Sequence, residues 1–285
     1  GFLLATPSNG DTSSRADFVD QLDTGWMQND YWFDGTAEIN QYASTRIMYG
    51  TPRPTDETAH IIVTEKHDPE LLVKADDWRR PGLLDVVKFN YVTSARTGVY
   101  TYHQMFSFFF AQSDLRLAKM TLASHEWCGN TFKELVNVEG RESYDFNTYW
   151  DGQGNGSHDV DFPDGLVVYD SLPVQLRALP WRLGLRTELD LLPSQLSSKA
   201  PRPRWSRATL EVTAEETIEV EAGRFTTWVV ELEHDRGTDR LWFETAFPHR
   251  MIRWEAASGD THALRASTKM PYWQFNQPSD EQRLP

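Results

Sequence analysis

Residues 208–234 read "ATLEVTAEETIEVEAGRFTTWVVELEH", and this stretch decides the fold class. Apolar and polar side chains alternate through Ile218 and Val220, pause at Gly223, and alternate again as far as Leu232. Alternation with a period of two is typical of a half-buried strand, and a glycine at the break is typical of a hairpin turn. The stretch therefore predicts two antiparallel strands joined by a turn at Ala222 and Gly223.

The same pattern continues on both sides of this hairpin. Downstream, residues 240–270 predict three more strands, with a tight turn at 258–260. Upstream, strand patterns recur at 31–50, 58–67 and 85–110, and residues 114–139 predict a hairpin that turns at Gly129 and Asn130. Consecutive hairpins of this kind form an antiparallel meander, so we expect a mainly β fold.

The middle of the chain has a different pattern. "YDSLPVQLRAL", residues 169–179, predicts a short amphipathic helix with Ser171 as its N-cap, Pro173 near its start, and Leu172, Leu176 and Leu179 on one face. Four prolines punctuate residues 180–207, which look too irregular for a strand. We expect one β domain over 25–285, with residues 166–206 inserted as a helical and Pro-rich cap.

Composition limits the functional classes. The chain has 285 residues, which suffices for one large domain, and 13% of them are aromatic. A formal net charge of -14 argues against nucleic acid as a partner, because a phosphate backbone needs a basic surface. The single cysteine, Cys128, excludes an internal disulfide but leaves the compartment open.

The N-terminal stretch "GFLLATPSNGDTSSRAD" is polar after a short apolar piece. It resembles the tether that follows a removed signal or lipoprotein anchor, so residues 1–24 are expected to be flexible and the protein exported. The alternative is the trimmed terminus of a cytosolic protein.

Several segments resemble an uncharacterised family of bacterial periplasmic and lipoprotein half-barrels, which is similar in architecture to lipoprotein-carrier proteins. The resemblance rests on "IEVEAGRFTTWVVEL" (218–232), "DRLWFETAFPHRMIRWEAASGDTHALRAS" (239–267), "YWFDGTAEINQY" (31–42) and "SHEWCGNTF" (124–132). It implies a strongly curved antiparallel sheet wrapped partly around a helical or loop plug, a location in the bacterial periplasm or tethered to the outer membrane, and a concave face that could hold an acyl chain or similar ligand. It implies no catalytic residues.

Candidate catalytic residues gather in "SHEWCGNTF". His125, Glu126 and Cys128 lie within four positions, but a period of two places His125 and Cys128 on opposite faces of a strand. A Cys-His pair would then need another histidine, such as His103 or His249, to approach in space. The alternative is that Cys128 is a small buried hydrophobe beside a turn.

The most metal-like segment is "DGQGNGSHDVDFPDG", residues 151–165. Asp151, Asn155, Asp159 and Asp161 echo part of a calcium loop, but Phe162 occupies the position of the bidentate glutamate. A flexible acidic surface loop is the alternative, and no metal or other cofactor is predicted.

Residues 100–110 contain more aromatic side chains than is usual for one strand. These side chains either fill the core or line a pocket. The predicted ligand-binding residues are Tyr100, Tyr102, Phe106, Phe108, Phe110, Trp127 and Leu176. Near the cap, Arg202, Arg204 and Arg207 form a basic patch that could contact anionic headgroups or pair with nearby acids.

Three functions follow from these features. The leading hypothesis is noncatalytic binding of an apolar or amphipathic ligand such as a lipid, or a role in envelope assembly. The second is a hydrolase-like enzyme that uses His125 and Cys128 with a carboxylate, and the third is a purely structural interaction protein. A large apolar cavity would favour the first, and a polar cleft with convergent histidine and acid side chains would favour the second.

Overall fold

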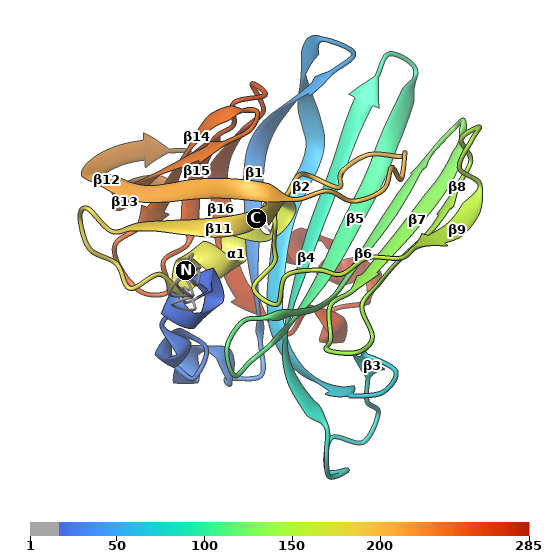
Figure 1. Cartoon of the computed structure of the whole chain (residues 1–285). Helices are drawn as coiled ribbons and strands as arrows, with labels where there is room; N and C mark the ends of the chain where they lie inside the picture. Colours follow the sequence, from blue (N-terminus) through green and yellow to red (C-terminus); the bar gives the residue numbers. More distant parts are fainter. Residues whose placement is uncertain (1–16, 285) are drawn as a thin grey trace, which may run out of the picture.

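The computed structural model describes residues 17–284, and within them the chain forms one sheet of sixteen strands (Figure 1). The strands are β1 Ala37–Met48, β2 Thr51–Asp68, β3 Val73–Lys74, β4 Leu84–Thr97, β5 Tyr100–Ala111, β6 Leu117–Glu126, β7 Gly129–Val136, β8 Ser143–Thr148, β9 Asn155–His158, β10 Val167–Val168, β11 Arg186–Leu192, β12 Ser206–Val220, β13 Gly223–His234, β14 Gly237–Glu244, β15 Met251–Glu255 and β16 Thr261–Met270. The predicted mainly β class is confirmed.

The sheet joins both halves of the chain. Its strand order runs from β10 through β16, continues with β1, β2 and β4, and ends at β9, with β3 attached to β2. Strand β1 pairs antiparallel with β16, from Ala37 opposite Met270 to Thr45 opposite Thr261. Every pair is antiparallel except β10 with β11. The C-terminal meander therefore continues directly into the N-terminal one.

Register shifts bend the sheet. They occur in β1 after Gln41, in β12 between Val212 and Ala214, and in β14 between Trp242 and Phe243. Such bulges increase local twist and curvature. Figure 1 shows the sheet curled at β11–β16 and spread open toward β7–β9. The curved, half-barrel-like antiparallel sheet is thus confirmed.

The predicted helix forms and plugs the curled part of the sheet. It consists of α1, Leu172–Gln175, flanked by 3-10 turns at Tyr169–Ser171 and Leu176–Ala178. Its leucines are buried as expected, but so is the opposite face, including Arg177. Ser171 occupies the predicted N-cap position but makes no capping hydrogen bond, because its single hydroxyl hydrogen is shared between the Val168 carbonyl and Gln175 Oε1, each at 2.7 Å. Other 3-10 turns lie at Phe18–Gln21, Thr24–Trp26, Asp30–Trp32, Tyr272–Gln274 and Pro278–Arg283.

The middle region is more regular than its prolines suggest. Residues 186–192, predicted to be irregular, form strand β11, which pairs with β12 from Arg186 opposite Glu211 onward. The prolines lie outside this strand, and its alternate side chains Thr187, Leu189 and Leu191 are buried. The alternation of buried and more exposed side chains is therefore present in this segment, although the surrounding prolines obscure it in the sequence. We call residues 193–205, which remain irregular, the cap loop.

Two further predictions are wrong in detail. The β6–β7 hairpin turns at Trp127 and Cys128, because Glu126 pairs with Gly129. Gly129 lies in the strand, where a Cβ atom would come within 2.5 Å of the Tyr149 ring, so glycine allows a close approach and not a turn. The prediction of a flexible segment through residue 24 is wrong at its C-terminal end, since Phe18, Val19 and Leu22 are buried in the core. Residues 1–16 lie outside the described part of the chain.

Candidate functional site

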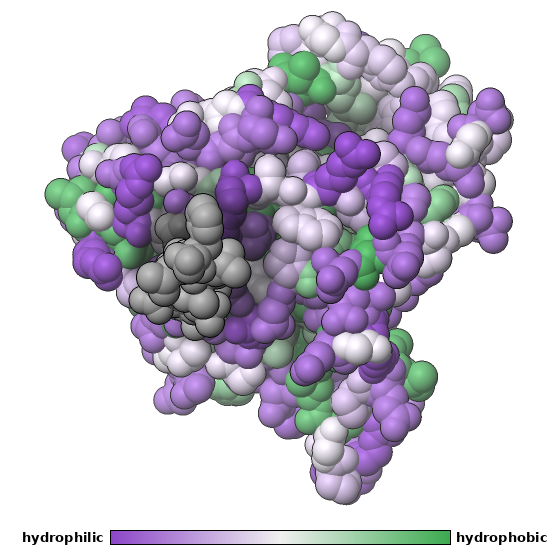
Figure 2. All heavy atoms as spheres, viewed as in Figure 1, coloured by the Kyte–Doolittle hydropathy of each residue, from purple (hydrophilic) through white to green (hydrophobic). Residues whose placement is uncertain are grey.

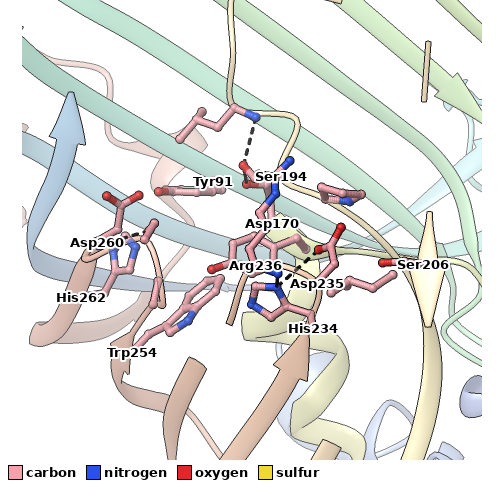
Figure 3. Close-up of a pocket in the computed structure, with 16 residues that line it drawn as sticks. Tyr91, Asp170, Ser194, Ser206, His234, Asp235, Arg236, Trp254, Asp260 and His262 are labelled. Atoms are coloured by element: carbon pink, nitrogen blue, oxygen red, sulfur yellow. Dashed lines mark hydrogen bonds and ion pairs between the residues drawn. The ribbon is translucent and has the colours of Figure 1, made fainter. Parts of the chain in front are cut away.

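A cavity of about 260 Å³, open to solvent on one side, lies where the curled end of the sheet meets the helical plug and the cap loop (Figure 3). Six segments line it: β4, the start of the plug, the end of β11 with the cap loop, the start of β12, and the β13–β14 and β15–β16 turns. The lining residues are Tyr91, Tyr169, Asp170, Leu191, Pro193, Ser194, Leu196, Ser206, His234, Asp235, Arg236, Trp254, Ala256, Ser258, Asp260 and His262.

Aromatic rings form a continuous arc in the cavity wall. Tyr91 lies 6.3 Å from His262, which lies 5.6 Å from Trp254, between ring centroids. Trp254 lies 5.0 Å from Tyr169, and Tyr169 lies 5.8 Å from His234. The five rings come from four strands and the plug, so only the tertiary fold assembles them.

Asp239, at 0% side-chain exposure, organises one end of this arc. Its carboxylate accepts hydrogen bonds from Tyr169 Oη at 2.6 Å, Trp254 Nε1 at 3.0 Å, His234 Nε2 at 3.0 Å and the Ala257 backbone N–H at 2.8 Å. Burial alone would raise the pKa of this carboxyl, and the hydrogen bonds outweigh it and lower the pKa. Asp239 therefore carries a fixed, fully hydrogen-bonded negative charge.

His234 is held at both ring nitrogens. Nε2 faces Asp239, and Nδ1 lies 3.3 Å from the Arg236 backbone nitrogen and 3.8 Å from Asp235 Oδ1. The hydrogen bond to Asp239 raises the pKa of His234 against the opposing effect of burial. With both nitrogens engaged by the protein, the ring fixes the β13–β14 turn and presents its face, not a free nitrogen, to its aromatic neighbours.

Asp170 ties the plug to the cap loop. Its carboxylate accepts from Ser194 Oγ at 2.6 Å and from the Gln195 backbone N–H at 2.7 Å, and burial raises its pKa. On the other side of the cap loop, Lys133 of β7 donates to the Gln195 carbonyl at 2.9 Å. Burial lowers the pKa of Lys133 to about 8.

His262 is neutral at physiological pH. It is 6% exposed, its Nδ1 lies 2.8 Å from Ser44 Oγ, and burial, with a smaller effect of Arg46, lowers its pKa to about 4. The cavity thus contains one neutral histidine ring and one that is paired with a carboxylate.

None of the seven predicted ligand-binding residues lines this cavity. Phe106, Phe108, Phe110 and Leu176 are fully buried in the core, where successive phenylalanine rings of β5 stack on one face. Tyr100, Tyr102 and Trp127 lie near hairpin tips. The region predicted to form a cap does contribute to the cavity, since Pro193, Ser194 and Leu196 of the cap loop line it.

The candidate catalytic residues are not assembled into a site. Cys128 is exposed in the β6–β7 turn, so the prediction of a buried hydrophobe is wrong. Its backbone N–H donates to Glu126 Oε2 at 2.6 Å, and Glu126 raises the pKa of the thiol. His125 is also exposed and stacks on His103 across the strands, with 5.3 Å between ring centroids. His249 instead packs against Trp181 and Phe247.

The calcium-loop alternative does not form. Asn155–His158 is strand β9, paired with β8, and Gln153 accepts from the Ala200 backbone N–H at 2.9 Å. Asp151, Asp159 and Asp161 therefore do not surround a common point. Across residues 17–284, no group of three or more His, Cys, Asp or Glu side chains is placed to hold a metal ion.

Two arginines of the predicted basic patch, Arg202 and Arg207, have protein contacts. Arg207 pairs with Asp190 at 3.0 Å, and Arg202 donates to the Asp159 carbonyl. Arg204 lines a shallow surface groove beside Trp205. Pairing with nearby acids was one of the two alternatives, and contact with a membrane stays a prediction. Among the described helices, none has the length and apolarity needed to span a bilayer.

Sequence reasoning missed the cavity residues, although a signal for them exists. His234 and Asp239 flank one turn of the meander, and Trp254 and His262 flank the second turn after it. Alternate turns of a meander lie at the same end of the sheet, so the positions of these residues beside alternate turns are the signal that would have grouped them. The view in Figure 2 shows a mostly hydrophilic face whose apolar residues form small separate groups.

Comparisons with protein-family models, curated proteins and solved structures found no match.

Proposed function

We propose that this protein binds a small amphipathic ligand, without catalysis, in the cavity between the meander, the plug and the cap loop. The observation that carries the proposal is a concave space of about 260 Å³ with an aromatic wall and a few convergent polar groups. Concave, partly apolar sites with few polar groups are the usual form of small-molecule sites. The volume suits a ligand of few heavy atoms.

Two observations bear on the alternatives. An extended acyl chain would need an open concave face, but Phe106, Phe108 and Phe110 are fully buried there, among core residues. A hydrolase is suggested by histidine and acid side chains at one cavity, the arrangement expected of an enzyme. However, a general base needs a nitrogen within reach of the proton it removes. Both nitrogens of His234 are engaged by the protein, and Nδ1 of His262 faces Ser44 Oγ at 2.8 Å. Binding therefore explains the geometry better than catalysis.

The resemblance to envelope half-barrels supports a second part of the proposal, that the protein works in the bacterial periplasm or at the outer membrane. Fractionation of bacterial cells that express the protein from its full-length gene tests this part. Recovery in the cytosolic fraction alone would remove it without affecting the proposed ligand site.

The ligand site can be tested by filling it. Ser206 lines the cavity, so Ser206→Trp should occupy it, and Ser157→Trp, on the exposed edge strand β9, is the matched control. We expect saturation-transfer NMR with a library of small fragments to find binders that wild type and Ser157→Trp share and Ser206→Trp loses. A second filling variant, Ala256→Phe, guards against misfolding of the first, and circular dichroism checks the fold of each.

The outcomes are distinct. If no fragment distinguishes the filled variants from the control, the cavity is not a binding site and the proposal fails. If wild type converts a fragment to a product, the protein is an enzyme and the noncatalytic reading fails.

A further inference from the structure

We propose that the cavity takes a small organic cation with a methylated ammonium group, an inference that rests on the proposed function. The arc of Tyr91, His262, Trp254, Tyr169 and His234 places five rings around one side of the cavity, each within 6.3 Å of the next. Aromatic faces attract cations through the ring quadrupole, and cages of such rings recognise methylated ammonium groups.

Asp239 strengthens this wall. Trp254 and Tyr169 both direct their polar hydrogens at its carboxylate, at 3.0 Å and 2.6 Å. Hydrogen bonds from an N–H or O–H to an anion polarise the donor and shift electron density onto its ring. The two rings at the centre of the arc therefore present more negative faces than free tryptophan and tyrosine would. The effect requires no contact between Asp239 and the ligand.

The charges around the cavity also favour a cation. Asp170, Asp235 and Asp260 line it with carboxyl groups, and Asp239 lies behind the arc. The cationic lining residues are Arg236 and His234, and His234 is paired with Asp239 at 3.0 Å. Arg46 and Lys133 are near enough to act on the pKa of Asp170, but they do not line the cavity. His262 is neutral, since burial lowers its pKa to about 4.

Other ligand classes fit less well. A neutral apolar molecule would desolvate the carboxyl group of Asp260 without compensating it. An anion would be repelled by the carboxyl groups that line the cavity. Arg236 would attract it, but His234, the other cationic lining residue, is already paired with Asp239. Figure 3 shows Asp260 beside His262 at one end of the arc, so a cation held there has a carboxylate near it.

Choline and its uncharged carbon isostere, 3,3-dimethylbutan-1-ol, have nearly the same shape and differ in charge. A difference between their affinities therefore measures the contribution of the positive charge. By isothermal titration calorimetry, we expect choline to bind at least about tenfold more tightly than the alcohol, because only the cation gains from the ring faces and carboxylates. Asp260→Asn keeps an oxygen that can accept from the Ile47 backbone N–H, and should weaken choline about tenfold while leaving the alcohol unchanged. Trp254→Leu should also weaken choline.

Asp151→Asn, at the exposed β8–β9 turn, is the matched control and should leave both affinities unchanged. Equal affinity for choline and the alcohol, or an unchanged choline affinity in Asp260→Asn, would overturn the cation inference. So would fragments that bind in the cavity while choline does not, and in each of these cases the proposed function would survive. If neither compound binds and the filled variants lose no fragment, the proposed function fails as well.

Discussion

At the scale of single residues, the most buried charge pair is that of Arg177 in the plug and Glu38 in β1. The guanidinium makes two hydrogen bonds to the carboxylate, at 2.7 and 2.9 Å, and both side chains are at most 1% exposed. Burial would raise the pKa of Glu38, but Arg177 and the other hydrogen-bond donors outweigh it and lower the pKa. The rings of Trp26 and Trp32 lie 5.1 and 5.3 Å from the guanidinium.

Removal of one partner should be costly. We expect Arg177→Met to lower the free energy of unfolding by about 3–5 kcal/mol, because Glu38 would remain charged and buried. The double variant Glu38→Gln with Arg177→Met should recover part of that loss. Arg265→Met is the control, since Arg265 pairs with Glu221 on the surface and should change stability by less than about 1 kcal/mol. Chemical denaturation measures all three, and a double variant no more stable than the single one would contradict the explanation.

His262 should make stability depend on pH. Because its folded pKa of about 4 lies below the ordinary value of 6.5, the unfolded chain binds a proton that the folded chain excludes between these pH values. Stability should therefore fall as pH falls from about 6.5 to about 4, by on the order of 3 kcal/mol from this residue. His262→Gln should flatten the pH profile of urea unfolding, whereas exposed His125→Gln should not. Parallel profiles for wild type and His262→Gln would refute this.

At the scale of elements, the β6–β7 hairpin places its thiol at an exposed turn. A neutral maleimide should modify Cys128 in the folded protein, and its rate should rise with pH as the thiolate forms. Glu126 raises the thiol pKa, so Glu126→Gln should speed the reaction at pH 7. Glu139→Gln, at another exposed position, should leave the rate unchanged. Labelling only after denaturation would show that the turn is closed in solution.

Element boundaries show where local reasoning worked. Strands β12–β16 and the Tyr169–Ala178 helix were predicted because their alternation, leucine spacing and turn residues lie close together in the sequence. The β6–β7 turn was misplaced because Gly129 is explained by Tyr149, twenty positions later, and not by its neighbours. Strand β11 was not predicted because the prolines on both sides of it, Pro180 and Pro193, obscure its alternation.

At the scale of the whole molecule, the cap loop bridges the open and curled parts of the sheet. Lys133 and Thr131 of β7 donate to the Gln195 and Ser198 carbonyls, Tyr144 of β8 donates to Gln195 Oε1, and Asp170 of the plug accepts from Gln195. These contacts hold the cap loop over the cavity that its own residues line. Opening of the cap loop would be the natural route for a ligand.

Loosening these contacts should open the cap loop. In the double variant Lys133→Met with Tyr144→Phe, we expect amide hydrogen exchange at 194–198 to rise about tenfold, while β13 and β14 remain protected. The on-rate of any cavity ligand should rise with it. Lys119→Met is the control, because Lys119 on neighbouring β6 pairs with Glu134 and not with the cap loop. Unchanged exchange at 194–198 would mean that other contacts hold the segment closed.

A meander of antiparallel strands with a short helical insertion can be inferred from the sequence alone, because period-two alternation and turn chemistry are local properties. Only the tertiary structure decided that β1 pairs with β16, that Arg177 meets Glu38, and that rings from residues 91, 169, 234, 254 and 262 share one cavity. Those contacts join segments up to about 230 positions apart. Strand register and the packing of the plug set them, and no window of neighbouring residues contains that information.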